Sequence, residues 1–164
     1  MNGKVPSAPD STHNYAQPWS WSQLEDSYGM FSAEYDLSPS WTAYLIGGGK
    51  YTRENGVYAS NYVYGADGAA RIGRLYSPLD QETLSLATGL RGELQTGPVS
   101  HKVNLAANGI WQEKRNAFES TSAANREEGN LYDGSPVSVP TASKPSGDLH
   151  DPDTTGKVQN KSLA

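Results

Sequence analysis

The stretch Thr83–Gln112, TLSLATGLRGELQTGPVSHKVNLAANGIWQ, decides the fold class of this 164-residue chain. Apolar residues recur at every second position in two arms, on either side of a break at residues 96–100. Because successive side chains of a strand point to opposite faces, the stretch predicts a β-hairpin with one apolar and one polar face. The predicted apolar face carries Leu84, Leu86, Thr88, Leu90, Gly92 and Leu94 in the first arm and Val103, Leu105, Ala107, Gly109 and Trp111 in the second.

A second hairpin precedes it. The same alternation fills residues 27–52, around a turn at residues 36–40 where Pro39 and its flanking serines supply turn chemistry. We therefore expect five segments. They are a loop at 1–24, the first hairpin at 25–52, a long loop at 53–81, the second hairpin at 82–116, and a long loop at 117–164 that leads to the start of a next strand.

The composition narrows the class of protein. Hydrophobic residues make up 35% of the chain, below the ordinary globular range of about 45–50%, while glycine and proline number 17 and 10. The net charge of −5 gives no basic surface for nucleic acid. Cysteine is absent, which excludes disulfides and thiolate chemistry. We also find no apolar run of the roughly 20 residues that a membrane helix needs and no signal peptide at the N-terminus.

The apolar face of the hairpins requires either a packed core or lipid. Each arm runs for about 10–13 residues, near the length that a tilted strand needs to cross a bilayer and longer than the usual soluble strand. Short turns alternate with long loops, as in transmembrane barrels. Aromatic residues lie where the arms end and predict membrane-interface anchors: Tyr35, Trp41, Tyr51 and Trp111. The fold expected is an all-β, antiparallel transmembrane β-barrel fragment of about four strands.

Several stretches also resemble a known family. Glu34–Tyr44, EYDLSPSWTAY, looks like a periplasmic turn of the TonB-dependent ferric-siderophore receptors of the outer membrane. Gln17–Trp21, Leu90–Lys102 and Gly156–Ala164 are similar to other pieces of that family's barrel. The resemblance extends over nearly the whole chain.

The resemblance implies a parent barrel of about 22 strands around a plug, located in the bacterial outer membrane. Its turns would be periplasmic and its long loops extracellular. The expected partners are a ferric siderophore, the TonB complex acting through the plug, and outer-membrane lipid. Iron would enter only within the siderophore, so we expect no cofactor. This chain would be an internal barrel fragment, without a signal peptide or plug, and not transport-competent alone.

Candidate ligand contacts lie in the first long loop. Aromatic faces and guanidinium donors suit a bulky, often anionic iron chelate. The candidates are Tyr58, Tyr62, Tyr64, Arg71, Arg74 and Tyr76. A structural alternative is that these rings pack on the rim of the barrel.

Neither catalysis nor metal binding is predicted. The histidines His13, His101 and His150 are scattered, with no pairing at metal-ligand spacing. No G-x-S-x-G nucleophile motif occurs, and the glycines at 47–49 lack the spacing of a phosphate loop. Two other functions stay open, a soluble all-β binding module with long recognition loops and a non-functional gene remnant.

Overall fold

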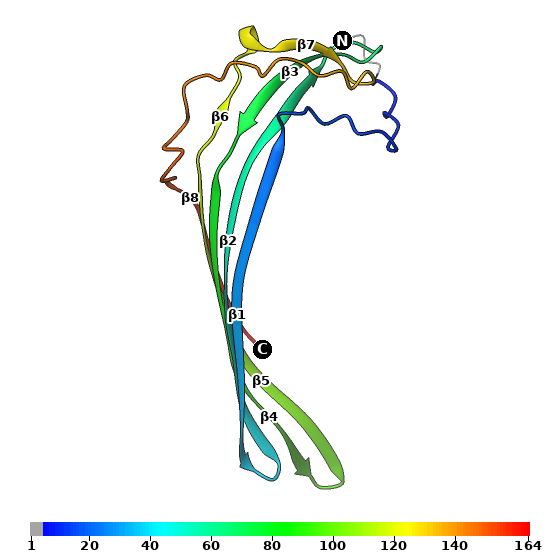
Figure 1. The fold of residues 1–164 in the computed structure, drawn as a ribbon. Coiled ribbons are helices and arrows are strands. Elements are labelled where there is room, and N and C mark those ends of the chain that lie inside the picture. The colour runs from blue at the N-terminus through cyan, green and yellow to red at the C-terminus, as the bar shows by residue number, and fades with distance from the viewer. Residues whose placement is uncertain (1–4) are drawn as a thin grey trace. The chain divides into compact units, whose positions relative to one another are not determined.

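A computed structural model describes residues 5–164, which are mainly β-strand (Figure 1). The chain divides into two compact units. The hairpin unit comprises Glu25–Arg53, Asp80–Arg115 and Thr154–Ala164. The connection unit comprises the described residues up to Leu24 together with Glu54–Leu79 and Asn116–Asp153. In the described part of the chain, no helix is long and apolar enough to cross a membrane.

Two hairpins and one further strand form the hairpin unit. Its sheet order is β1 (Trp21–Ser38), β2 (Trp41–Val63), β4 (Leu79–Thr96), β5 (Val99–Asn116) and β8 (Thr154–Leu163), so β1 and β8 lie at the two edges. A two-residue turn joins β4 to β5, and Gly97 adopts a positive φ of 59° there. Only glycine adopts this conformation readily, which explains the sharp reversal. The two predicted hairpins are therefore present.

The predicted division into two faces is also present in the hairpin unit. On the apolar side, the ideal Cβ position of Gly47 lies 2.5 Å from the ring of Phe31 and 3.3 Å from Leu86. On the other side, Lys102 and Glu93 form an ion pair at 3.4 Å. Side chains from different strands thus meet on the faces that the period of two predicts.

The connection unit carries the buried core. The end of β2 pairs antiparallel with β3 (Ala69–Tyr76), in a register that runs from Val57 opposite Tyr76 to Val63 opposite Ala70. Two short strands, β6 (Glu119–Ser120) and β7 (Glu127–Asn130), pair with β3. A 3₁₀ turn, η1 (Ala123–Asn125), lies between β6 and β7 in the chain. The buried apolar side chains are Val57, Ala70, Ile72 and Ala117.

The structure differs from the expected segment boundaries in three places. Strand β1 begins at Trp21, inside the expected first loop. The expected loop at 53–81 contains the end of β2, all of β3 and the start of β4. The expected loop at 117–164 contains β6, β7 and β8. The sheet therefore includes a strand beyond the two hairpins.

The sequence of β8 did not predict a strand, and the reason is physical. Its sequence, TTGKVQNKSL, has only two large apolar residues, Val158 and Leu163, and they fall on opposite faces. Period-two alternation of polarity is therefore absent. Backbone hydrogen bonding to β5 defines this strand instead, in a register from Ala107 opposite Leu163 to Arg115 opposite Thr154.

Candidate ligand-binding and membrane surfaces

The predicted ligand residues divide between the two faces of the β2–β3 pair. Directly opposed residues of an antiparallel pair share a face. Tyr62 lies opposite Arg71, whereas Arg74 lies opposite Ala59 and Tyr76 opposite Val57. One face therefore carries Tyr58, Tyr62, Tyr64 and Arg71, and the other carries Arg74 and Tyr76.

The first face presents an exposed polar cluster. Tyr64 donates a hydrogen bond from its hydroxyl to Glu128 Oε2 at 2.8 Å, and Arg71 Nε donates to Glu128 Oε1 at 2.9 Å. The Arg71 guanidinium also lies 5.8 Å from the centre of the Tyr64 ring, in cation–π geometry. Tyr62 and Arg71 are 56% and 52% exposed. These groups can reach a solute without any rearrangement of the core.

Glu128 acts as the organising acceptor of this cluster, and sequence reasoning missed it. It belongs to β7, which pairs with β3 so that Glu128 lies opposite Arg71. Hydrogen bonds from Tyr64 and then Arg71 lower the pKa of the Glu128 carboxyl below its usual value. The same contact with Glu128 raises the pKa of the Tyr64 phenol. No local sequence pattern connects residues 57 positions apart.

Arg126, a second residue that sequence reasoning missed, lies near the cluster. Its Nη1 donates to the carbonyl oxygen of Ser60 at 2.9 Å. Ser60 lies opposite Gly73, and an ideal Cβ on Gly73 would come within 3.4 Å of the Arg126 guanidinium carbon. The glycine thus leaves space for this side chain on the same face as Arg71.

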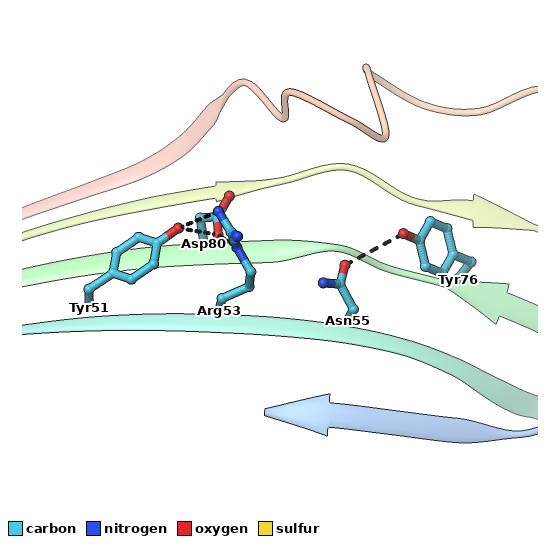
Figure 2. A network of polar contacts seen from close by, with 5 residues as sticks. All are labelled: Tyr51, Arg53, Asn55, Tyr76 and Asp80. Atoms are coloured by element: carbon cyan, nitrogen blue, oxygen red, sulfur yellow. Dashed lines mark hydrogen bonds and ion pairs between the residues drawn. The ribbon is translucent and has the colours of Figure 1, made fainter. Parts of the chain in front are cut away.

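The other candidates have structural partners. Arg74 forms an ion pair with Glu119 at 3.1 Å, and both side chains are mostly covered. The Tyr76 hydroxyl donates to Asn55 Oδ1 at 3.5 Å, as Figure 2 shows. On the first face, the Tyr58 hydroxyl donates to Glu54. The structure thus groups Tyr62, Tyr64 and Arg71 and separates Arg74 and Tyr76 from them.

The second candidate surface is the apolar face of the hairpin unit, which no other layer covers among the described residues. Its leucines are exposed, with Leu84 at 56%, Leu86 at 41% and Leu94 at 41%. None of the buried apolar side chains belongs to this unit. A soluble sandwich would bury this face against a second sheet. The exposed face suits lipid instead.

The predicted interface aromatics lie on this apolar face. Tyr35 is 72% exposed. Trp41 covers Gly92, whose ideal Cβ position lies 2.4 Å from the Trp41 ring, and Trp111 similarly covers Gly109 at 2.6 Å. Trp41 and Trp111 are half-buried, whereas Tyr35 is exposed, and all three are amphipathic rings of the kind found at membrane interfaces.

Tyr51 joins a polar network on the same unit (Figure 2). Its hydroxyl donates to Asp80 Oδ1 at 2.7 Å, and Arg53 Nε donates to the same oxygen at 3.1 Å. Arg53 Nη2 in turn donates to the Tyr51 hydroxyl at 2.9 Å. The Tyr51 hydroxyl thus donates one hydrogen bond and accepts another. This suits a ring that lies between an apolar and an aqueous region.

No group of three or more potential metal ligands occurs among residues 5–164. The exposed cluster offers phenol, guanidinium and carboxylate groups, which suit hydrogen bonding to an organic chelate.

The antiparallel sheet of the hairpin unit and its uncovered apolar face are consistent with a fragment of a β-barrel. No family model matches the chain. The sequence is 32% identical over 160 residues to the ferrichrome receptor FcuA of Yersinia enterocolitica, covering 98% of this chain and 21% of the relative. The chain thus spans about a fifth of the length of that curated relative.

The comparison with solved structures also finds a similar fold. The structure of BauA, the ferric preacinetobactin receptor from Acinetobacter baumannii, matches with a TM-score of 0.71 at 20% sequence identity. The match covers 98% of this chain and 24% of that chain. The resemblance first drawn from Glu34–Tyr44 is therefore confirmed as a similarity to a segment of a ferrichrome receptor, and the structural match shows the same fold.

Proposed function

We propose that this chain forms part of the barrel wall and extracellular loops of a bacterial outer-membrane receptor that binds and imports ferric siderophores. The observation that carries the proposal is the apolar face of the hairpin unit, which has no covering layer although its leucines and aromatics are large. Water is a poor solvent for such a continuous face, whereas a bilayer is a good one. The likeness to a ferrichrome receptor supports the same function.

The proposed ligand contacts are the exposed members of the polar cluster. Tyr62 supplies an aromatic face, and Arg71 supplies guanidinium donors beside it. Arg126 adds positive charge on the same side. Arg74 and Tyr76 instead stabilise the connection unit through Glu119 and Asn55. The substrate class is an iron chelate bound as cargo, with no catalytic step.

Import requires parts of a receptor outside this segment. Strands β1 and β8 form the edges of the sheet in the hairpin unit, and edge strands present backbone groups for pairing. We propose that further barrel strands pair there. Energy coupling would involve the TonB complex acting on a plug, as the resemblance implies.

Membrane association is tested by flotation. The 164-residue chain is refolded with phosphatidylcholine vesicles and centrifuged through a density gradient. We expect the chain to float with the vesicles and to resist extraction by high salt, because apolar burial rather than charge holds it. Recovery as a monodisperse, vesicle-free monomer would overturn the proposal.

Ligand contact is tested on the same preparation. We expect ferrichrome to quench tyrosine and tryptophan fluorescence, and we expect Arg71→Ala and Tyr62→Ala to weaken this effect. Lys102→Ala is the matched control, because Lys102 lies on the hairpin unit and is 86% exposed. Equal effects of Arg71→Ala and Lys102→Ala would place the chelate elsewhere.

A further inference from the structure

The acidic excess of the chain lies in the connection unit. Its described residues, 5–24, 54–79 and 116–153, hold ten aspartates and glutamates against four arginines and lysines. The hairpin unit holds eight residues of each kind and is balanced. The unit that carries the proposed ligand contacts is therefore negative as a whole, although two of those contacts, Arg71 and Arg126, are cations.

Glu128 offsets the positive charge of Arg71 within the polar cluster. Both residues lie on one face, because β7 places Glu128 opposite Arg71 of β3. The carboxylate accepts from Arg71 Nε with one oxygen at 2.9 Å and from the Tyr64 hydroxyl with the other at 2.8 Å. The contact with Tyr64, and then that with Arg71, lowers the pKa of the Glu128 carboxyl, so this group is ionised at neutral pH.

A second carboxylate balances the second cation of this face. Arg126 lies here, with its guanidinium carbon 3.4 Å from the ideal Cβ position of Gly73. Asp67, between β2 and β3, adds a negative charge near Tyr64. The hydrogen bond to Glu128 is the main cause that raises the pKa of the Tyr64 phenol, and the charge of Asp67 contributes less. The two cations of the face are thus matched by two carboxylates.

This balance provides hydrogen-bond donors without a net positive charge. The guanidinium of Arg71 has N–H donors in its Nη groups besides the Nε–H that Glu128 accepts, and the Tyr62 ring beside it is exposed. Such groups can bind the carbonyl and hydroxamate oxygens of an uncharged chelate. An anionic chelate meets carboxylates within a Debye length, about 8 Å at physiological ionic strength. Like charges brought together at a binding surface act against the wrong partner.

We propose that Glu128 sets the charge selectivity of the polar cluster, so that the cluster takes an iron chelate without net negative charge and disfavours anionic chelates. Glu128 orients Arg71 and Tyr64 and cancels the charge by which Arg71 alone would attract an anion. Each hydroxamate carries one negative charge, so a ferric trihydroxamate is uncharged and belongs to the preferred class. This inference rests on the proposed function, because it requires a chelate to bind at this cluster.

The test compares two chelates on the 164-residue chain refolded in phosphatidylcholine vesicles, whose zwitterionic surface adds no net charge. Ferrichrome is uncharged, and ferrichrome A has a similar trihydroxamate iron centre with added carboxylates. Quenching of tyrosine and tryptophan fluorescence gives an apparent Kd for each chelate. We expect the unchanged chain to bind ferrichrome about tenfold more tightly than ferrichrome A. Glu128→Gln should reduce this ratio about fivefold, the upper range for one exposed charge pair.

Two variants control for net charge and for side-chain shape. Glu127→Gln removes the same charge from the same unit, but Glu127 lies opposite Ile72 on the other face of β7, so the ratio should stay unchanged. Glu128→Asp retains the carboxylate and should retain the selectivity. Added sodium chloride should lower the ratio for the unchanged chain, because it screens the repulsion. This salt titration tests the charge effect even where a variant fails to fold.

The outcomes distinguish the inference from the function on which it rests. Equal Kd values for the two chelates, a ratio that does not depend on salt, or equal ratios in Glu128→Gln and Glu127→Gln would overturn the charge selectivity alone. Absence of quenching by either chelate would overturn the proposed ligand contact as well.

Discussion

Arg91 of β4 and Glu34 of β1 form an ion pair across the intervening strand β2. Strands two apart in a sheet lie about 10 Å from each other, so only two long side chains on one face can make this contact. Both side chains are about half exposed, at 53% each. The pair therefore lies on the polar face of the hairpin unit and buries no charge.

Removing this ion pair should cost little stability. Because both groups are exposed to solvent, a double-mutant cycle of Arg91→Ala and Glu34→Ala should give a coupling free energy of about 0.2–1 kcal/mol. Denaturant unfolding of the refolded chain in micelles measures it, and added salt should reduce it. A coupling energy above about 2 kcal/mol would indicate a desolvated pair instead.

A charge on the opposite face should cost more. Leu90→Arg places a guanidinium on the apolar side, and we expect a loss of about 2–4 kcal/mol if the position is near the bilayer midplane. Asn104→Arg is the matched control on the polar face, where Asn104 accepts a hydrogen bond from Tyr44. Unfolding from lipid micelles compares the two variants. A loss below about half a kcal/mol for Leu90→Arg would contradict the lipid-facing orientation.

Gln17 should be important for the connection unit. Its amide is buried and bridges two backbone groups, donating to the carbonyl oxygen of Ser135 at 3.3 Å and accepting from the Val137 N–H at 2.9 Å. Gln17→Ala leaves both groups without this partner, at a cost of about 1–3 kcal/mol. Hydrogen exchange at the Val137 amide should accelerate. Gln17→Glu, which retains an acceptor, should protect that amide better, and equal exchange in both variants would count against the bridge.

Acid should weaken the Glu128 cluster. A carboxyl with a lowered pKa in the folded state stabilises it above the ordinary glutamate pKa, and this contribution is lost as pH falls through the folded value. The Glu128 titration, followed by NMR of its side-chain carbon, should therefore have its midpoint below about 4.3. Tyr64→Phe removes the larger cause and should raise the midpoint. A midpoint unaffected by Tyr64→Phe would exclude the hydrogen bond as that cause.

The sequence was most informative where the signal is local. Alternation along Thr83–Gln112 predicted the second hairpin and its two faces. The structure adds the ion pairs on the polar face, which join Arg91 to Glu34 and Glu93 to Lys102. The choice of partner depends on which strands become neighbours, and polarity along one strand carries no information on that.

The sequence by itself determined the two-faced hairpins, because a period of two is a property of consecutive residues and specifies which side chains must avoid water. Only the tertiary structure decided that β8 is a strand, because its hydrogen bonds to β5 do not depend on an alternating pattern of its own. Tertiary pairing of β7 with β3 likewise brought Glu128 to Tyr64 and Arg71. The ligand candidates were proposed from residue type alone, and their grouping depends on the register of strands distant in sequence.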